Sequence, residues 1–265
     1  MKKANIIDRF RLDGKVALVT GGSGYYGKQM VIALADAGAT VCCASRGYEN
    51  CKKFTDELNA MGYDKVYADS YDQADEESIK ALLARMIERD GKVDILVNNS
   101  VLRPMHDYNG PVEDFAKSME VNATGLFLIT RAFGNHMEEN GGGSIINIGS
   151  YMGICGSNPY LYEDNPDMDA IDAPDYFFHK GGMLNLTRFM AGRYGKAGVR
   201  VNCLNLGGLF NNQPKEFLER YAKMCYLGRM ADENDIQGVL VFLASDASSY
   251  ITGIGINVDG GYTAR

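Results

Sequence analysis

A tyrosine and a lysine four residues apart, Tyr176 and Lys180, are the side chains of this sequence best suited to acid–base chemistry. Residues i and i+4 share one face of a helix, so the phenol and the ammonium group can converge. Free tyrosine has a pKa of roughly 10, and a neighbouring positive charge stabilises the phenolate and brings that pKa toward the physiological range. The pair therefore predicts a group that donates or accepts a proton, although this spacing alone is common by chance.

A glycine-rich turn at residues 20–27 joins an apolar run at 16–20 to a helical stretch at 28–37, and a second apolar run follows at 40–44. Glycine permits a tight turn and lets backbone N–H groups approach a pyrophosphate, which then faces the positive end of the helix. The strand–helix–strand context favours a dinucleotide site over a glycine-rich turn without a ligand.

The end of the second apolar run indicates which dinucleotide binds. Folds that take NAD usually carry an acid there for the ribose 2′-hydroxyl, but this chain has Ser45 followed by Arg46. No carboxylate is present to repel a 2′-phosphate, and a guanidinium group can pair with one. The sequence therefore predicts NADP as the cofactor, with NAD left open as the alternative.

These residues need a framework that brings strand ends together. Apolar runs alternate with helical patterns along the chain, which predicts an α/β, doubly wound parallel sheet of the Rossmann type, with about seven strands, helices on both faces and a single domain at 1–265. The expected strands are 16–20, 40–44, 66–68, 93–98, 144–148, 199–204 and 254–258, and the expected helices are 28–37, 75–89, a stretch through 126–137, 176–194 and 232–244.

One segment interrupts this alternation between Ser150 and Tyr176. It contains an inserted loop at about 157–175, with Tyr160, Tyr162 and six acidic residues. Loops of this length in compact domains often form lids or binding loops. We expect a lid or wall of a substrate site, and the alternative is a solvent-exposed excursion of the surface.

Composition excludes several classes of protein. The 265 residues are 46% hydrophobic and carry a net charge of -7, which suits a globular protein and does not favour a nucleic-acid partner. No apolar run approaches the roughly 20 residues that span a membrane. The six cysteines show no metal-binding or disulfide spacing, so we expect no metal, reduced thiols and a cytoplasmic location.

The chain resembles the short-chain dehydrogenase/reductase family over nearly its whole length. The matching segments, in the family's order, are 12–21, 98–99, 121–125, 146–150, 176–180, 199–203 and 245–261. Three features depart from the family pattern. Tyr25 replaces the middle glycine of the turn, Leu206-Gly207 stands where Pro-Gly is usual, and the gap from Ser150 to Tyr176 is about double the usual one.

The resemblance implies a hydride-transferring oxidoreductase with four catalytic residues. Tyr176 would exchange a proton with the substrate oxygen, and Lys180 would lower the pKa of that phenol and hold the nicotinamide ribose. Ser150 would hydrogen-bond the substrate oxygen, and Asn122 would anchor a proton relay.

The resemblance also implies a cofactor site in which Asp69 meets the adenine amine and Asn98 lies beside the adenine ribose. The expected cofactor-binding residues are Gly21, Ser23, Gly24, Tyr26, Gly27, Ser45, Arg46, Asp69, Ser70, Asn98, Lys180, Gly207 and Leu209. The candidate substrate residues are Arg103, Tyr160, Tyr162 and Asn211. For Arg103, binding of a substrate carboxylate and a surface ion pair stay open, and His179 is expected to pack rather than to catalyse.

The region from Gly207 to Ala231 is similar to a bacterial branch that includes flagellin-modification and nonulosonic-acid oxidoreductases, and to dehydrogenases of gluconate-type sugar acids. This implies an NADP(H)-dependent enzyme that interconverts a secondary alcohol and a ketone on a sugar, sugar acid or polyol. The family resemblance also implies a homotetramer. The alternatives are an NAD-dependent step in nonulosonate biosynthesis and a non-catalytic dinucleotide sensor. Steroids and aromatic ketones stay open as substrates.

Overall fold

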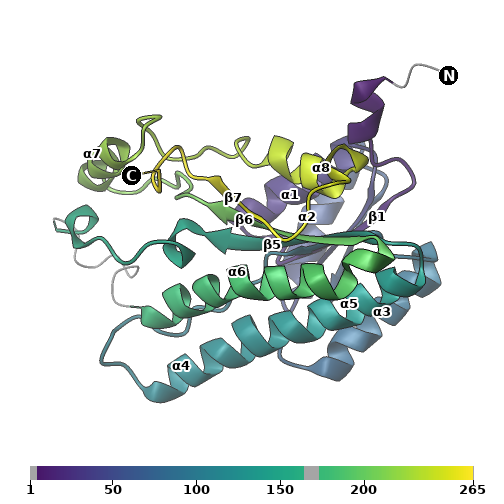
Figure 1. Cartoon of the computed structure of the whole chain (residues 1–265), viewed down its shortest axis with the longest axis horizontal. Coiled ribbons are helices and arrows are strands. Elements are labelled where there is room, and N and C mark those ends of the chain that lie inside the picture. Colours follow the sequence, from purple (N-terminus) through teal and green to yellow (C-terminus); the bar gives the residue numbers. More distant parts are fainter. Residues whose placement is uncertain (1–4, 164–172, 265) are drawn as a thin grey trace.

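Seven parallel strands form one sheet in the computed structural model, which describes residues 5–163 and 173–264 (Figure 1). The order across the sheet is β3-β2-β1-β4-β5-β6-β7. The strands are β1 (Val16–Thr20), β2 (Thr40–Ser45), β3 (Val66–Ser70), β4 (Ile95–Asn98), β5 (Gly143–Ser150), β6 (Val199–Leu206) and β7 (Gly255–Val258).

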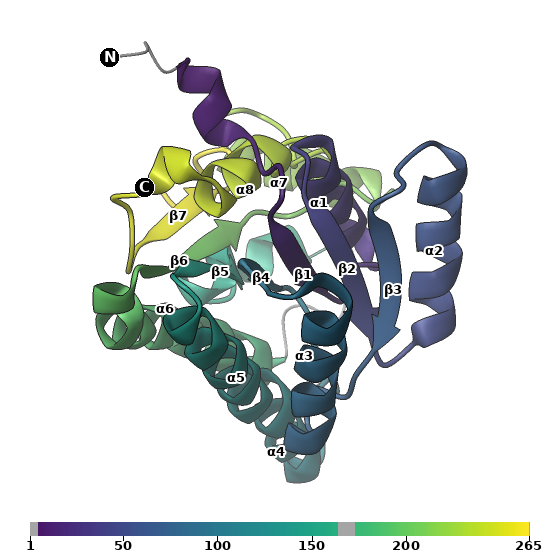
Figure 2. The ribbon, with the colours of Figure 1, turned by 90° about the vertical axis from the view of Figure 1, so that its right-hand side faces the viewer.

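Helices cover both faces of this sheet (Figure 2). The cores on the two faces show that α1, α2 and α8 pack on one face and that α3, α5 and α6 pack on the other. The helices are α1 (Tyr25–Asp36), α2 (Tyr48–Ala60), α3 (Glu76–Asp90), α4 (Val112–Met119), α5 (Leu126–Glu139), α6 (Pro174–Tyr194), α7 (Lys215–Met224) and α8 (Gln237–Ala244). A π-helical turn spans Glu120–Gly125, and 3₁₀ turns span Ile6–Phe10, Tyr151–Gly153, Pro159–Leu161, Gly195–Ala197 and Asp246–Ser248.

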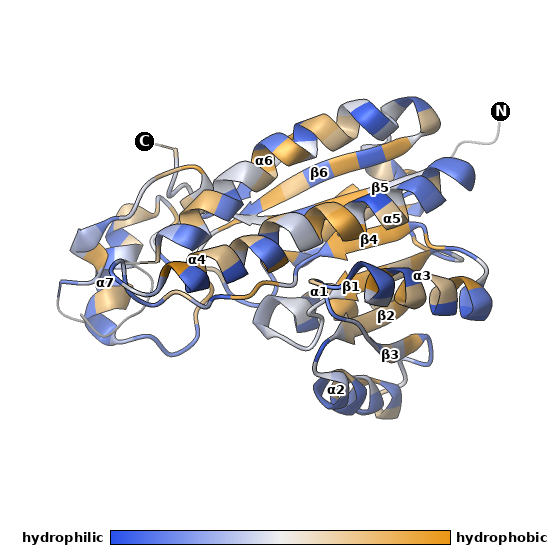
Figure 3. Ribbon diagram, turned by 90° about the horizontal axis from the view of Figure 1, so that it is seen from below, coloured by the Kyte–Doolittle hydropathy of each residue, from blue (hydrophilic) through white to orange (hydrophobic). Residues whose placement is uncertain are grey.

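The central strands are buried on both sides, as expected for a parallel sheet between two helical layers. All residues of β1 and β4 are buried. In Figure 3 these strands are coloured as hydrophobic, whereas the exposed surface of α2 is largely hydrophilic. The parallel register brings the carboxyl ends of all strands to one edge, where ligands of such folds bind.

A third apolar core lies beyond that edge, which we call the aromatic cluster. It joins the turn after β5, the described part of the insertion, α7 and the C-terminal segment. Its buried members are Tyr151, Leu161, Tyr162, Phe217, Tyr221, Cys225, Met230 and Tyr262. Figure 1 shows α7 and the C-terminus side by side beyond the strand ends. This cluster gives the segments after the strands a core of their own.

The predicted doubly wound sheet is confirmed, with each strand within three residues of its expected bounds. Helices α2, α4 and α7 were not predicted. The helix expected at 232–244 begins only at Gln237, because the Asp235 carboxylate accepts hydrogen bonds from the Asp232 N–H and from Arg229 and holds a turn there. Part of the predicted inserted loop, residues 164–172, lies outside the described residues.

Candidate active site

Two of the candidate catalytic residues, Ser150 and Lys180, are joined through strand β5. Ser150 ends β5, and its Oγ accepts a hydrogen bond from the Met152 N–H at 3.2 Å. Lys180 is buried on α6, and its Nζ donates to the Ile148 carbonyl oxygen of β5 at 2.6 Å. A Cβ atom at Gly153 would lie 2.6 Å from the Lys180 carbonyl oxygen. The chain after Ser150 therefore crosses α6 closely, and glycine permits that approach.

Tyr176 lies in the first turn of α6 with two cationic groups around its ring. The Lys180 Nζ lies 5.6 Å from the ring centroid, and the Arg103 guanidinium carbon lies 4.6 Å from it. The ring of His179 meets it edge-on, with centroids 5.2 Å apart. The structure thus brings Tyr176, Lys180 and Arg103 together, and Lys180 links them to the strand of Ser150.

Asn122 lies in the π-helical turn, and its side chain fastens the segment after β4. Its Oδ1 accepts from the Leu102 N–H at 2.9 Å, and its Nδ2 donates to the Leu102 carbonyl oxygen at 2.6 Å and to Ser118 at 3.0 Å. The side chain therefore positions the segment that carries Arg103, and a relay through this residue stays a prediction.

A cavity of about 210 Å³ lies at the ends of β1 to β4. It is lined by Gly21, Ser45, Arg46, Gly47, Tyr71, Asp72, Gln73, Ser100, Val101, Leu102 and Val121. Arg46 is exposed at its rim, and no described residue forms an ion pair or hydrogen bond with its guanidinium group. The cavity combines a free cation beside Ser45 with polar groups from the segment after β3.

Two expected cofactor residues lie elsewhere. Asp69 belongs to β3, and its carboxylate accepts hydrogen bonds from Arg85 at 2.7 and 3.1 Å. Arg85 also donates to the Ser70 carbonyl oxygen at 2.8 Å. Among the described residues, neither Asp69 nor Ser70 lines the cavity, whereas Asp72 does. Asp72 follows the strand end, which is the signal that separates it from Asp69.

The glycine turn is tightly built. Gly21 has a φ of +62°, and a Cβ atom at Gly27 would lie 2.3 Å from the Gly21 carbonyl oxygen. Gly24 caps α1 without a side-chain hydrogen bond, which leaves N–H groups of the first helical turn for an anion. A second cavity, of about 690 Å³, adjoins this turn and is lined in part by Ser23, Gly24, Leu209 and Asn211. These features fit the pyrophosphate of a dinucleotide.

Other expected residues have structural contacts. Asn98 is buried, and its Nδ2 donates to Thr130 at 3.1 Å and to Asn147 at 2.8 Å, so its side chain joins β4 to β5 and α5. Tyr162 is 6% exposed in the aromatic cluster, 5.5 Å from Phe217. This burial places the ring in the aromatic cluster, and a contact of Tyr162 with a substrate stays a prediction.

Tyr160 is half-exposed, and Arg220 lies over its ring at 4.8 Å. Arg220 also pairs with Glu163 at 2.9 Å. These contacts hold the described part of the insertion against α7. Asn211 lies by the glycine turn rather than among the contacts of Tyr176.

Sequence reasoning missed the pKa shifts of two buried groups, His179 and Cys51. Burial, with the charges of Lys180 and Arg103, lowers the pKa of His179 to about 3, and neither ring nitrogen has a hydrogen-bond partner. A hydrogen bond from Cys43 lowers the pKa of Cys51 to about 6, aided by Ser45 and Ser23 against the opposing effect of burial. No sequence signal marks either shift, because both depend on burial and on contacts that the folded chain creates.

Comparisons with known proteins agree with this geometry. The family model described as enoyl-(acyl carrier protein) reductase matches residues 26–263. A galactitol 2-dehydrogenase (L-tagatose-forming) of Cereibacter sphaeroides is 33% identical, over 96% of this chain and 97% of that protein. No helix among the described residues has the length and hydropathy of a membrane span.

Two solved structures share the fold. A gluconate 5-dehydrogenase from Burkholderia cenocepacia in complex with NADP and tartrate is 28% identical, with a TM-score of 0.88 over 98% of this chain and 100% of that one. A 7α-hydroxysteroid dehydrogenase complexed with NADH and 7-oxo glycochenodeoxycholic acid is 29% identical, with a TM-score of 0.87 over 98% of each chain. The protein therefore belongs to the short-chain dehydrogenase/reductase family and is an NAD(P)-dependent oxidoreductase that interconverts secondary alcohols and ketones.

Proposed function

We propose that this protein is an NADP(H)-dependent oxidoreductase that interconverts a secondary alcohol and a ketone on a sugar, sugar acid or polyol. The observation that carries the proposal is the position of Tyr176 between two cations, on a helix that Lys180 ties to the strand of Ser150. Arg46, exposed at the rim of the cavity at the ends of β1 to β4, supports a preference for NADP over NAD.

In this proposal the protein's own groups handle the proton and the substrate oxygen. Tyr176 donates or accepts the proton at its hydroxyl, Ser150 hydrogen-bonds the reacting oxygen, and Lys180 is the charged neighbour that also holds the cofactor ribose. Asn122 anchors the relay. A bound nicotinamide cofactor would supply or accept the hydride.

Cofactor contacts follow from the two cavities. Gly21, Ser23, Gly24 and Gly27 would hold the pyrophosphate through backbone groups, since a helix N-terminus favours anions. Other proposed contacts are Tyr26, Asn98 through its backbone, Gly207, Leu209 and, at the adenine, Asp72 in place of Asp69.

Ser45 and Arg46 support NADP, because a guanidinium group pairs well with phosphate oxygens. The gluconate 5-dehydrogenase was solved with NADP and the steroid dehydrogenase with NADH, so relatives of both kinds exist. NAD is the second candidate cofactor.

The substrate class rests on Arg103 and on two relatives. The Arg103 guanidinium is exposed and stacks on the Tyr176 ring, where it can bind a carboxylate on a polyhydroxylated chain. The relatives named for galactitol and gluconate act on such chains. Tyr160 offers a half-exposed ring.

We also propose a homotetramer in the cytoplasm. Large apolar side chains are exposed on α4, α5 and α6, namely Val112, Phe127, Phe178 and Phe189. Such a surface suits burial against another copy of the chain. None of the six cysteines, all of which lie among the described residues, forms a disulfide, which suits a reducing compartment.

The test is a spectrophotometric screen of sugars, sugar acids, polyols and steroids with NADP and NAD, run in both directions. We expect the highest turnover with a polyhydroxylated substrate and NADP. Turnover of steroids alone, or with NAD alone, would replace the proposal, and absence of turnover with a bound dinucleotide would favour the sensor.

A further inference from the structure

The loop after β6 lies beside the reacting groups. Leu206, the last residue of β6, is the register partner of Ser150, so Gly207 follows directly at the edge where Ser150 ends its strand. If the proposed function holds, the reacting nicotinamide ring must touch the substrate carbon that Ser150 and Tyr176 hold. The Gly207–Gly208 peptide is then a wall of the nicotinamide site.

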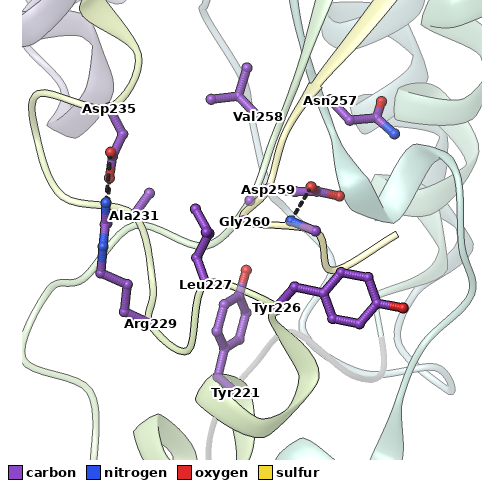
Figure 4. Close-up of a pocket in the computed structure, with 12 residues that line it drawn as sticks. Tyr221, Tyr226, Leu227, Arg229, Ala231, Asp235, Asn257, Val258, Asp259 and Gly260 are labelled. Carbon is purple, nitrogen blue, oxygen red and sulfur yellow. Dashed lines mark hydrogen bonds and ion pairs between the residues drawn. The ribbon is translucent and has the colours of Figure 1, made fainter. Parts of the chain in front are cut away.

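This loop lacks the proline that usually stiffens it in the family, and space adjoins it. A cavity of about 440 Å³ lies next to Gly207 and is lined by Tyr221, Leu227 and Asp259, among others (Figure 4). A loop of two glycines and no proline has high conformational freedom, so it needs other restraints to hold one geometry.

Two tyrosine hydroxyls from different parts of the chain supply those restraints. The Tyr26 hydroxyl, from the first turn of α1, donates to the Gly207 carbonyl oxygen at 3.0 Å. The Tyr221 hydroxyl, from α7, accepts from the Gly208 N–H at 2.6 Å. Figure 4 shows Tyr221 rising from α7 with its hydroxyl directed into the cavity, toward the strand end that carries Val258. The carbonyl oxygen and the N–H of the Gly207–Gly208 peptide each therefore form a hydrogen bond with a tyrosine hydroxyl.

Close packing around this peptide requires glycine at both positions. A Cβ atom at Gly207 would lie 2.9 Å from the Asp259 Cα, and one at Gly208 would lie 3.1 Å from the Tyr221 ring. Burial raises the pKa of both phenols, so both hydroxyls keep their protons at physiological pH.

We propose that Tyr26 and Tyr221 are positioning residues that fix the Gly207–Gly208 peptide and, through it, the nicotinamide half of the cofactor site. Tyr26 links the glycine turn to this loop, and Tyr221 links the loop to the aromatic cluster. Together they take the place of the missing proline. The inference rests on the proposed function for the cofactor.

The test compares two ligands, NADPH and 2′-phospho-ADP-ribose, which lacks only the nicotinamide. Their dissociation constants are measured by fluorescence and calorimetry for the wild type, Tyr26→Phe and Tyr221→Phe. We expect each variant to bind NADPH about three- to tenfold more weakly, the range of one neutral hydrogen bond. Binding of 2′-phospho-ADP-ribose should change less than about twofold, because the two hydroxyls that are removed bind Gly207 and Gly208 and not the adenosine cavity or the backbone of the glycine turn.

The matched control is Tyr63→Phe. The Tyr63 hydroxyl donates to Asp36 at 2.9 Å and so ties the opposite end of α1. This variant should bind both ligands as the wild type does. The double variant Tyr26→Phe/Tyr221→Phe should lose less NADPH affinity than the product of the single losses, because both hydroxyls hold one peptide.

The remaining outcomes would contradict the positioning role of the two tyrosines. Unchanged NADPH affinity in both single variants overturns the inference, and so does an equal loss for both ligands, which indicates a general structural role. Should one variant fail to fold, the other carries the same comparison. A wild type that binds 2′-phospho-ADP-ribose and NADPH equally well overturns the positioning role alone, whereas a wild type that binds neither overturns the proposed function as well.

Discussion

In the cofactor half of the molecule, residues 16–100, the proposed binding groups follow the ends of four parallel strands. In the substrate lobe, residues 150–163, 207–231 and 259–262, they depend on ring contacts and on side chains that bind backbone groups. The rings of Tyr151 and Tyr262, for example, pack with centroids 4.6 Å apart, although the two residues are 111 positions apart in the sequence. A sheet edge fixes its residues through backbone register, whereas the lobe fixes its residues one side chain at a time.

The difference teaches where substitutions act. A strand end tolerates many side chains because its position comes from the backbone ladder. The lobe has no such ladder, so each aromatic ring or hydroxyl carries a larger share of the local geometry. We therefore expect changes in the two regions to separate cofactor binding from substrate turnover.

The largest expected effect lies where the two regions meet. Tyr176→Phe removes one hydroxyl and should lower turnover by about 10²–10⁴-fold, the usual contribution of an acid–base group, while NADPH affinity stays within about twofold. Steady-state rates and a fluorescence titration measure the two quantities. Tyr194→Phe on the same helix is the control, since its hydroxyl binds Asn135 and the Arg131 carbonyl oxygen, away from the proposed reacting groups. Near-normal turnover of Tyr176→Phe would show that another group moves the proton.

A pair of phenylalanine truncations tests the separation itself. Phe217 is 4% exposed in the aromatic cluster, and Phe54 is 7% exposed between α2 and the sheet. Each change to alanine should lower the free energy of unfolding by about 3–5 kcal/mol, measured by denaturant titration.

Their functional effects should differ. Phe217→Ala should raise the substrate KM and leave binding of 2′-phospho-ADP-ribose nearly unchanged, because its ring packs against Tyr221 with centroids 5.9 Å apart, at the reacting end of the site. Phe54→Ala should weaken binding of 2′-phospho-ADP-ribose, because α2 begins beside the cavity with Ser45 and Arg46. If both variants alter both constants equally, the two regions do not act separately.

Acid pH should act through His179 of α6, which lies outside the cofactor half. The pKa of His179 is about 3 in the folded chain, and unfolded histidine has a pKa of about 6.5. Between these values the unfolded chain binds the additional proton, so stability falls as pH falls through this window. The loss should be about 2 kcal/mol between pH 6.5 and 5.

Chemical denaturation at several pH values measures this slope. His179→Phe keeps a ring in place and removes the proton site, so the slope should flatten. The same slope in the wild type and the variant would assign the pH dependence to other groups.

The smallest expected effect is confined to the cofactor half. Arg46→Ala should weaken NADPH binding at least about tenfold, since a charge-assisted contact with a phosphate contributes about 1.5–3 kcal/mol, and it should leave NADH binding nearly unchanged. Lys53→Ala removes an exposed cation from the neighbouring helix α2 and serves as the control. Equal losses for both cofactors in Arg46→Ala would remove the 2′-phosphate contact from the account.

The sequence predicted the regular part of the molecule well. Apolar runs bounded by glycine marked the strands, because a buried parallel strand has a strong signature. It did not separate Asp69 from Asp72, since the exact end of β3 decides which acid reaches the cavity. The contacts of Asn98 likewise depend on Thr130 and Asn147, which lie on other elements.

The substrate lobe was harder to predict for a physical reason. Tyr162 reads as a polar aromatic residue of a loop, and its burial depends on Phe217 from α7, an amphipathic helix that was not predicted. The hydroxyls of Tyr26 and Tyr221 meet one loop from distant parts of the chain. Such contacts arise from tertiary packing and leave no local pattern.

The most direct test of the account is the ratio of kcat/KM for NADPH and NADH, measured with the best polyhydroxylated substrate from the screen. We predict a ratio of at least about ten in favour of NADPH, because one charge-assisted phosphate contact distinguishes the two cofactors. A ratio near one, or a preference for NADH, would contradict the assignment of Ser45 and Arg46 as the residues that select the cofactor.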